Sequence, residues 1–396
     1  MRPRYLMTAY WLWMLLLTVA FYARPTWHIP VWSAIALSGA GAVIIGVTRN
    51  KPRRKTPWVL LAVSLVSFAA GDTTYNLLTS IGHQVNPFPS LADVFYLITC
   101  VTQVAGMLGL VRASMAVRDR SALIDSLVLA SGVGVVYWVL LISPQVNSPD
   151  LSPIEKLISV AYPLTDVLLL ALVARLVVTS PRLPAALLLG TGIAGLLESD
   201  VAYGLSQLNA DWHIGGPVDI GWIVLYACVG AAALHPSMVA LTSPRAARSP
   251  EMGKWRLILL AASALVAPAT LVIETARGRF ADAAVIAALS AVVFMLVMVR
   301  LSDLLASNRL ALARERALRQ SGDAMVSAAD TDGVRAALNV AVRRMISGST
   351  AFHVDVVSGL SAPPDLEERR ARDADLSFTS ALGPALPEPF RAFELA

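Results

Sequence analysis

The sequence predicts an all-α integral membrane protein of about ten transmembrane helices, with a parallel internal repeat and a small cytoplasmic tail. Hydrophobic residues make up 56% of the 396-residue chain, and charged residues only 15%. A soluble domain would carry about 25% charged residues, so the composition excludes an ordinary soluble protein. The mean hydropathy of +0.63 points the same way. A pair of acidic residues, Asp72 and Asp93, is echoed further along the chain by Asp200 and Asp219.

Ten segments of the chain are long and apolar enough to be predicted as membrane spans. A helix rises about 1.5 Å per residue, so one crossing needs about 20 apolar residues. The predicted spans are approximately 5–23, 29–48, 57–82, 91–112, 121–143, 154–179, 184–208, 216–240, 255–276 and 281–303. An even number of spans returns the chain to the side on which it started.

The distribution of lysine and arginine predicts the orientation of these spans. Basic residues gather in alternate connections, chiefly 49–55, 112–120 and 245–256. The connections on the opposite side carry only Arg24 and the two arginines in 277–279. Because cytoplasmic loops carry the excess of Lys and Arg, we expect a multi-pass protein of the plasma membrane with both termini in the cytoplasm.

The acidic feature occurs twice. The segment 72–75 (Asp-Thr-Thr-Tyr) is echoed by 200–203 (Asp-Val-Ala-Tyr), and 93–96 (Asp-Val-Phe-Tyr) by 219–222 (Asp-Ile-Gly-Trp). The two aspartates lie 21 residues apart in the first copy and 19 in the second. Because both copies run outward and then back inward, they predict a parallel repeat about an axis along the membrane normal.

The predicted site lies where acidic and aromatic residues fall at a similar depth on the outer side of the membrane. A charged side chain at the bilayer centre costs on the order of 3 kcal/mol, so it is a candidate functional residue by default. The candidate ligand-binding residues are Asp72, Tyr75, Asp93, Tyr96, Tyr162, Asp166, Asp200, Tyr203 and Asp219. Asp125 is the exception in depth, because it falls near the inner end of its span.

Three interpretations of these carboxylates remain open. They are structural if each one caps a helix, as Asp93 and Asp219 would at the starts of their spans. They are functional if they line an outward-facing sensory pocket for a cation or polar ligand, with tyrosine walls. They form an ion or proton pathway if ionisable groups continue through several depths. A metal site is left unassigned, although His83 and His213 follow the two copies in corresponding places.

The chain is predicted to contain three parts. Residues 1–303 form the transmembrane domain, 304–322 a cytoplasmic linker helix, and 323–396 a small, incomplete α/β segment with a flexible tail. Leucines at near-heptad spacing over 301–320 predict a homodimer through that helix. We expect the helix to end at 321–323.

Beyond this end, the pattern predicts a second helix over 324–347 and a strand over 351–357. Alternating apolar residues indicate the strand.

Two stretches resemble a known group of signalling proteins. They are the Gly-Asp and Pro-Ser-Leu-Ala-Asp-Val-Phe-Tyr-Leu motifs within 71–97, and Ala-Tyr-Pro-Leu-Thr-Asp followed by leucines in 161–172. Over about 57–320 the chain resembles the membrane-sensor regions of actinobacterial cyclic-di-GMP signalling proteins of the GGDEF and EAL type. The segment from about 320 resembles the start of a GAF domain. The resemblance implies a sensory input module without its usual output, because no GGDEF, EAL or HD-type signature occurs.

The predicted function is a membrane-embedded input module that passes a stimulus to a cytoplasmic output domain or protein. No nucleophile elbow, P-loop or zinc-protease motif occurs, so we expect no enzymatic activity and no cofactor. No basic stripe interleaved with aromatic residues suggests nucleic-acid binding. The alternative function is a small-solute or ion transporter that uses the same acidic residues. The depth of the ionisable groups distinguishes the two, because transport requires them along a path.

Overall fold

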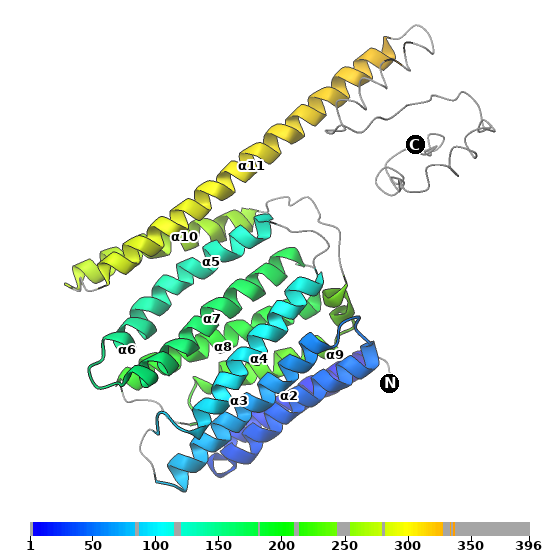
Figure 1. The fold of residues 1–396 in the computed structure, drawn as a ribbon. Helices are drawn as coiled ribbons and strands as arrows, with labels where there is room; N and C mark the ends of the chain where they lie inside the picture. Colours follow the sequence, from blue (N-terminus) through cyan, green and yellow to red (C-terminus); the bar gives the residue numbers. More distant parts are fainter. Residues whose placement is uncertain are drawn as a thin grey trace. The chain divides into compact units, whose positions relative to one another are not determined.

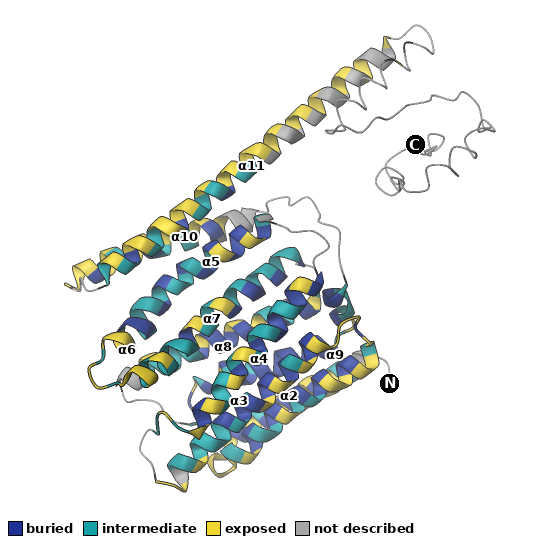
Figure 2. Cartoon of the chain, viewed as in Figure 1, coloured by how far each residue is buried: buried dark blue, intermediate teal, exposed yellow. Residues whose placement is uncertain are grey.

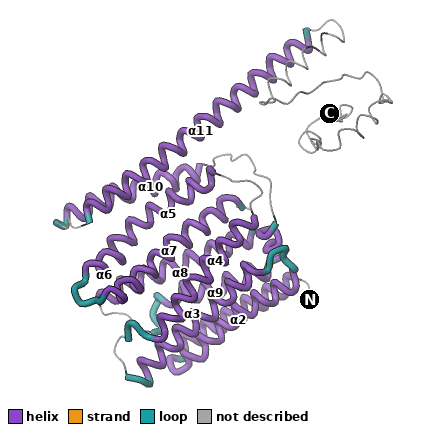
Figure 3. Tube along the Cα trace, viewed as in Figure 1, coloured by secondary structure: helices purple, strands orange, loops and turns teal. Residues whose placement is uncertain are grey.

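A computed structural model describes residues 3–83, 87–114, 120–180, 183–209, 214–243, 254–278 and 282–327, together with residues 333 and 336. The described residues are helical apart from short connections, and none of them forms a strand (Figures 1 and 3). The chain divides into two compact units, Met1–Arg300 and Leu301–Ala396. The first unit carries the predicted spans and is described first.

The helices follow the predicted spans closely. They are α1 (Pro3–Ala23), η1 (Pro25–Trp27), α2 (His28–Asn50), α3 (Thr56–Ser80), α4 (Leu91–Ser114), α5 (Arg120–Tyr137), η2 (Trp138–Ile142), α6 (Ser143–Asn147), α7 (Pro153–Thr179), α8 (Pro184–Asn209), α9 (Asp219–Leu234), η3 (Pro236–Thr242), α10 (Lys254–Ala276) and α11 (Ala283–Val326). Local backbone conformation and capping hydrogen bonds determine where several of these helices begin or end. Lys51 ends α2 in a left-handed conformation, and the Glu155 carboxylate accepts the Ser152 backbone N–H at 2.6 Å to start α7.

Eight of the described helices are long and apolar enough to cross a membrane, which identifies the architecture as that of a multi-pass membrane protein. The predicted span over 216–240 is not one straight helix. Its apolar run bends by 85° between α9 and η3. His235 is extended there because Pro236 disfavours the helical conformation of the residue before it. If this bent pair is one span the count is nine, and α10 offers only the shorter apolar segment Leu260–Ala276. The predicted count of ten is therefore not reproduced.

Six helices of the first unit form a closed ring. Each packs along the next in the order α2, α3, α4, α7, α8 and α9, and α9 packs back along α2. Helix α1 packs on α2 and α9, α5 packs on α7, and α10 packs on α5. Buried residues concentrate on the faces that the helices turn toward one another (Figure 2). The ring is the scaffold that positions the acidic residues.

Apolar side chains occur on both faces of many spans. Trp58, Leu61 and Tyr226 are fully buried in the core, whereas Leu16 and Val101 are more than half exposed. A helix that is apolar all round is typical of a membrane span, because its outer face meets lipid rather than water.

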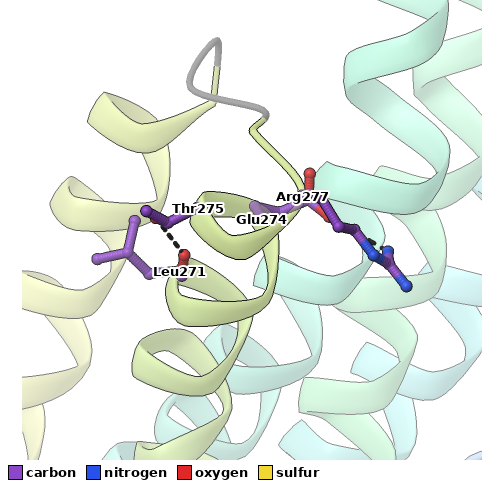
Figure 4. A network of polar contacts seen from close by, with 4 residues as sticks. All are labelled: Leu271, Glu274, Thr275 and Arg277. Carbon is purple, nitrogen blue, oxygen red and sulfur yellow. Dashed lines mark hydrogen bonds and ion pairs between the residues drawn. The ribbon is translucent and has the colours of Figure 1, made fainter.

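Polar groups at the end of α10 are bonded within their own helix (Figure 4). The Thr275 hydroxyl donates to the carbonyl of Leu271 at 2.7 Å. Arg277 lies 3.5 Å from the carboxylate of Glu274, but its side chain is 61% exposed. Because Arg277 is exposed to solvent while Glu274 is buried, this ion pair is partly screened by solvent and contributes little to stability.

Helix α11 runs without interruption from Ala283 to Val326 and so belongs to both units. The predicted end at 321–323 is therefore wrong. Gly322 costs a helix only about 1 kcal/mol relative to alanine, and the Ser327 N–H still donates to the Asp323 carbonyl at 3.0 Å. Beyond Ser327, the predicted helix to 347, the predicted strand over 351–357 and most of the tail to 396 lie outside the described residues.

Candidate ligand-binding cavity

A cavity of about 570 Å³ lies inside the ring. All six ring helices contribute to its lining, together with η2, α6 and the connection before α4. The structure brings all nine sequence-predicted site residues to this one cavity: Asp72, Tyr75, Asp93, Tyr96, Tyr162, Asp166, Asp200, Tyr203 and Asp219. Asp72 and Asp93 thus line the same cavity as their counterparts Asp200 and Asp219.

Asp72 lies on α3, which packs between α2 and α4 in the ring. Trp32 of α2 donates its indole N–H to Oδ2 at 2.7 Å, and Tyr96 of α4 donates its hydroxyl to Oδ1 at 2.8 Å. Each carboxylate oxygen of Asp72 thus accepts a hydrogen bond from a neighbouring helix. Gly71 makes this geometry possible, because a Cβ there would meet the Tyr96 ring at 2.5 Å. Close packing against Tyr96 therefore explains why a glycine precedes Asp72 in the sequence motif.

Asp200 lies on α8, which packs between α7 and α9 in the ring. Trp222 of α9 donates its indole N–H to Oδ1 at 2.8 Å. Asp166 of α7 lies within hydrogen-bonding reach of the same carboxyl group. A hydrogen bond between two carboxyl groups requires a proton on one of them. Like Asp72, Asp200 is held between the helix before it and the helix after it.

Asp93 and Asp219 both hold the start of a helix. The Ser90 backbone N–H donates to Asp93 at 2.7 Å, and the Gly215 backbone N–H donates to Asp219 at 2.6 Å. A carboxylate in the first helical turn is favoured by the helix dipole, as the structural interpretation expects. Asp93 also accepts the Tyr162 hydroxyl at 2.7 Å and so connects α4 to α7. Capping and lining the cavity are compatible roles for these two residues.

Aromatic rings form a connected wall between the two acidic centres. Trp32 and Trp222 meet edge to face, with ring centroids 6.4 Å apart and planes at 90°. Tyr203 lies 5.8 Å from Trp222, and Tyr96 lies 6.3 Å from Tyr162. Phe68 joins the two groups, with centroids 6.3 Å from Trp222 and 5.9 Å from Tyr96. The cavity is therefore acidic at separate points and aromatic in between.

Trp32 and Gln103 are two of the lining residues that sequence reasoning missed. Trp32 was overlooked because a tryptophan in an apolar segment carries no charge to mark it. Gln103 was overlooked for the same reason, although an uncharged amide in the middle of a span is itself a signal. Gln103 is only 3% exposed and lines the cavity. No hydrogen bond connects its amide with any residue in the described part of the chain.

One side of the cavity is formed by the π-helical turn η2. Leu140 and Leu141 line the cavity, and Leu141 packs on α8 at Gly204, where a Cβ would require the end of the Leu141 side chain to move. The turn also contacts the start of α11. The Trp138 indole N–H donates to Asp282 at 3.0 Å, and the Ser143 hydroxyl lies 2.7 and 2.8 Å from its two carboxylate oxygens. Single π-helical turns of this kind are frequent at functional sites.

Other candidates lie apart from the cavity. Asp125 forms a buried ion pair with Arg300 at 2.6 Å, with side chains 1% and 5% exposed. His83 is exposed and does not line the cavity, and His213 lies outside the described residues. In the parts of the chain that the structure describes, no group of three or more His, Cys, Asp or Glu side chains could hold a metal ion.

Comparisons with protein-family models, with curated proteins and with solved structures find no match to this chain.

Proposed function

We propose that the chain is a membrane-embedded sensory input module in which a ligand in the cavity acts on α11. The observation that carries this proposal is the position of η2. One part of this turn lines the cavity, and its ends bond Asp282 immediately before α11. A change in the volume or charge of the cavity contents would act on this turn first. The cavity and α11 are therefore coupled through a short and continuous set of contacts.

The contacts run in a definite order. Asp200 and Gly204 lie one helical turn apart on α8, and Leu141 packs on Gly204. Leu141 belongs to the same π-helical turn as Trp138, which bonds Asp282. A π-helical turn is a local irregularity, and shifting it along a helix exchanges one set of hydrogen bonds for another. Such an element has two discrete arrangements, which a bistable switch requires.

The membrane arrangement belongs to the same proposal. The bent pair α9–η3 and the shorter α10 complete ten crossings in addition to the eight long helices. With ten crossings and the distribution of Lys and Arg, both termini lie in the cytoplasm and the cavity opens outward.

The contact order of the ring supports the parallel repeat. Helices α2, α3 and α4 correspond in order to α7, α8 and α9. Asp72 and Asp200 both lie on the middle helix and both bond the preceding and following helices. The matching roles of Asp93 and Asp219 at the starts of α4 and α9 support the same alignment.

Transport is the second candidate function, and the depth of the ionisable groups argues against it. Among the described residues toward the predicted inner side, Asp125 is paired with Arg300 rather than facing the cavity. The acidic groups that line the cavity lie at the starts of α4 and α9, in the second halves of α3 and α8 and, for Asp166, at the middle of α7. A one-sided cavity suits sensing. Uptake of radiolabelled choline or putrescine by proteoliposomes would favour transport instead.

At the cytoplasmic end, α11 provides the connection to an output. Leu301, Leu305 and Leu312 are each about half exposed and follow a heptad pattern. We propose that two copies pair through 301–320, and that the paired helices pass the signal to a cytoplasmic partner or domain. By resemblance, that output belongs to cyclic-di-GMP signalling.

The proposal is tested by disturbing the cavity wall without any ligand. In a chain with Cys100 and Cys228 replaced by alanine, spin labels are attached at Arg53→Cys and Leu305→Cys, and their distance distribution is measured by electron paramagnetic resonance in nanodiscs. Gly204→Ala forces Leu141 to move, and Trp138→Phe removes the donor to Asp282 while keeping an aromatic ring.

Both variants should change the distance distribution. Gly41→Ala is the matched control, because nothing lies within 4 Å of a Cβ at that position. If Gly204→Ala and Trp138→Phe fold normally and both give the wild-type distribution, the coupling between the cavity and α11 does not exist.

A further inference from the structure

We infer that the cavity binds a small organic cation, an amine or a quaternary ammonium, and not a metal ion or an anion. This inference rests on the proposed sensory function, because it names the class of ligand for the same cavity. Four observations carry it: the charge of the lining, the separation of the carboxylates, the aromatic wall and an amide without a partner.

The lining is acidic, and His28 is the one basic side chain among the described residues that form it. Five carboxyl groups reach the cavity, and no Lys or Arg is among the described residues that line it. The five carboxyl groups present oxygen atoms, which carry partial or full negative charge, from five different helices. An anionic ligand would be repelled at such a site, because buried charges need partners of opposite sign.

The arrangement of the carboxyl groups does not suit a metal ion. A calcium site collects six to eight oxygen ligands around one point. Here the acidic groups are held apart on different helices, with Asp72 bonded to Trp32 and Tyr96 and Asp200 bonded to Trp222. Among the described residues, no three acidic, histidine or cysteine side chains lie close enough together to hold a metal ion. The volume of about 570 Å³ also far exceeds that of a bare ion and lies in the range of small-molecule pockets.

The aromatic wall gives an organic cation a second kind of contact. Trp32, Trp222 and Tyr96 line the cavity directly beside the carboxylates that they bond. A cation over the face of such a ring is attracted by its quadrupole, most strongly when water is excluded. A neutral ligand of the same shape would receive the apolar contact but lose both the cation–π and the carboxylate attraction.

Gln103 is the independent sign that the cavity has an occupant. Gln103 lies on α4 and lines the cavity, and it is only 3% exposed. Within the described part of the chain, it has no hydrogen-bond partner. The amide N and O of Gln103 are not among the fully buried atoms without a partner, so they are accessible from the cavity, where they can donate to and accept from a ligand. A ligand that carries N–H or O–H groups as well as its charge would satisfy it.

The test compares ligands of equal shape and different charge. Purified full-length protein in detergent is titrated by isothermal calorimetry with choline, with putrescine, and with 3,3-dimethylbutan-1-ol, the neutral isostere of choline. We expect one of the two cations to bind at least about tenfold more tightly than the neutral isostere. Failure of both cations to bind at millimolar concentration, or equal binding of the isostere, overturns the inference.

Two variants locate the binding. Asp72→Asn and Gln103→Leu should each weaken cation binding by about tenfold. Glu315→Gln removes an exposed carboxylate on α11 that does not line the cavity, and it should leave cation binding unchanged. Binding that is weakened equally by Glu315→Gln reflects general surface charge and also overturns the inference.

Failure of this inference is distinguishable from failure of the sensory proposal. The spin-label experiment uses no ligand, so α11 can respond to Gly204→Ala even if no organic cation binds. In that case the sensory proposal stands and only the class of ligand is wrong.

Discussion

Tyr96 on α4 donates its hydroxyl to Asp72 on α3 at 2.8 Å, and its ring lies directly against the backbone of α3. This contact joins two neighbouring helices at the acidic cavity. It also requires a residue without a side chain at position 71. The Gly-Asp pair in the sequence is thus explained by the close approach of a single tyrosine.

Gly71→Ala should destabilise the protein, because its Cβ would meet the Tyr96 ring at 2.5 Å and push the hydroxyl away from Asp72. We expect a loss of about 1–3 kcal/mol, the cost typical of overpacking a core. Unfolding in mixed micelles, followed by circular dichroism, measures this loss. Gly41→Ala is the control, since an alanine in that open helical position should be neutral or slightly stabilising. A stable Gly71→Ala protein would mean that Tyr96 is not constrained by this contact.

The ion pair between Asp125 and Arg300 should behave as a unit. Asp125→Asn or Arg300→Met alone leaves the other group buried without its partner, and each should cost about 3–5 kcal/mol. The double variant should recover much of this loss, because it removes both buried groups at once. Unfolding of the three variants beside wild type gives the coupling energy. Strictly additive losses would show that the two side chains do not depend on one another.

The orientation can be tested by the accessibility of single cysteines. In a chain with Cys100 and Cys228 replaced by alanine, Asp150→Cys, between α6 and α7, should react with an impermeant maleimide on intact cells. Arg53→Cys, between α2 and α3, should react only after permeabilisation. Both positions are exposed, so burial does not confuse the comparison. The reverse pattern would place the cavity on the cytoplasmic side.

Pairing through α11 predicts a pattern of cross-links. Leu312→Cys lies on the heptad stripe with Leu305 and should form a disulfide-linked dimer under mild oxidation in membranes. Ala306→Cys lies one position beyond Leu305, off the stripe, and should cross-link much less. Equal cross-linking at the two positions would indicate random collision rather than a defined dimer.

The sequence predicted which residues meet at the cavity but not how they are held. Asp72 and Asp200 could be foreseen because charges are rare in apolar helices, and because the echo placed them at the same depth. Trp32 could not, since a tryptophan in an apolar segment does not stand out from the residues around it, and the amide of Gln103 was a signal that the sequence analysis did not use. Their importance depends on which helices are neighbours in the ring, and that is a property of the packed fold.

Irregular backbone segments were the other features that the sequence did not predict. The π-helical turn at 138–142 lies in an unbroken apolar run and has no residue that marks it. The bend at Pro236 was visible as a proline but was included in a span, because the apolar run continues past it. Gly322 was expected to end α11, yet the helix continues because the cost of one glycine is small. In each case the surroundings of the residue, rather than its type, decided the local structure.

The distance between spin labels at Arg53→Cys and Leu305→Cys, measured as choline or putrescine is added, tests the central claim most directly. If a ligand in the cavity acts on α11, the distance distribution should change with the same half-saturation as binding by calorimetry. The change should be absent in Trp138→Phe, which keeps the cavity but loses the donor to Asp282. If a saturating concentration of the cation binds in the cavity and the distance distribution stays unchanged, the claim that the cavity controls α11 is contradicted.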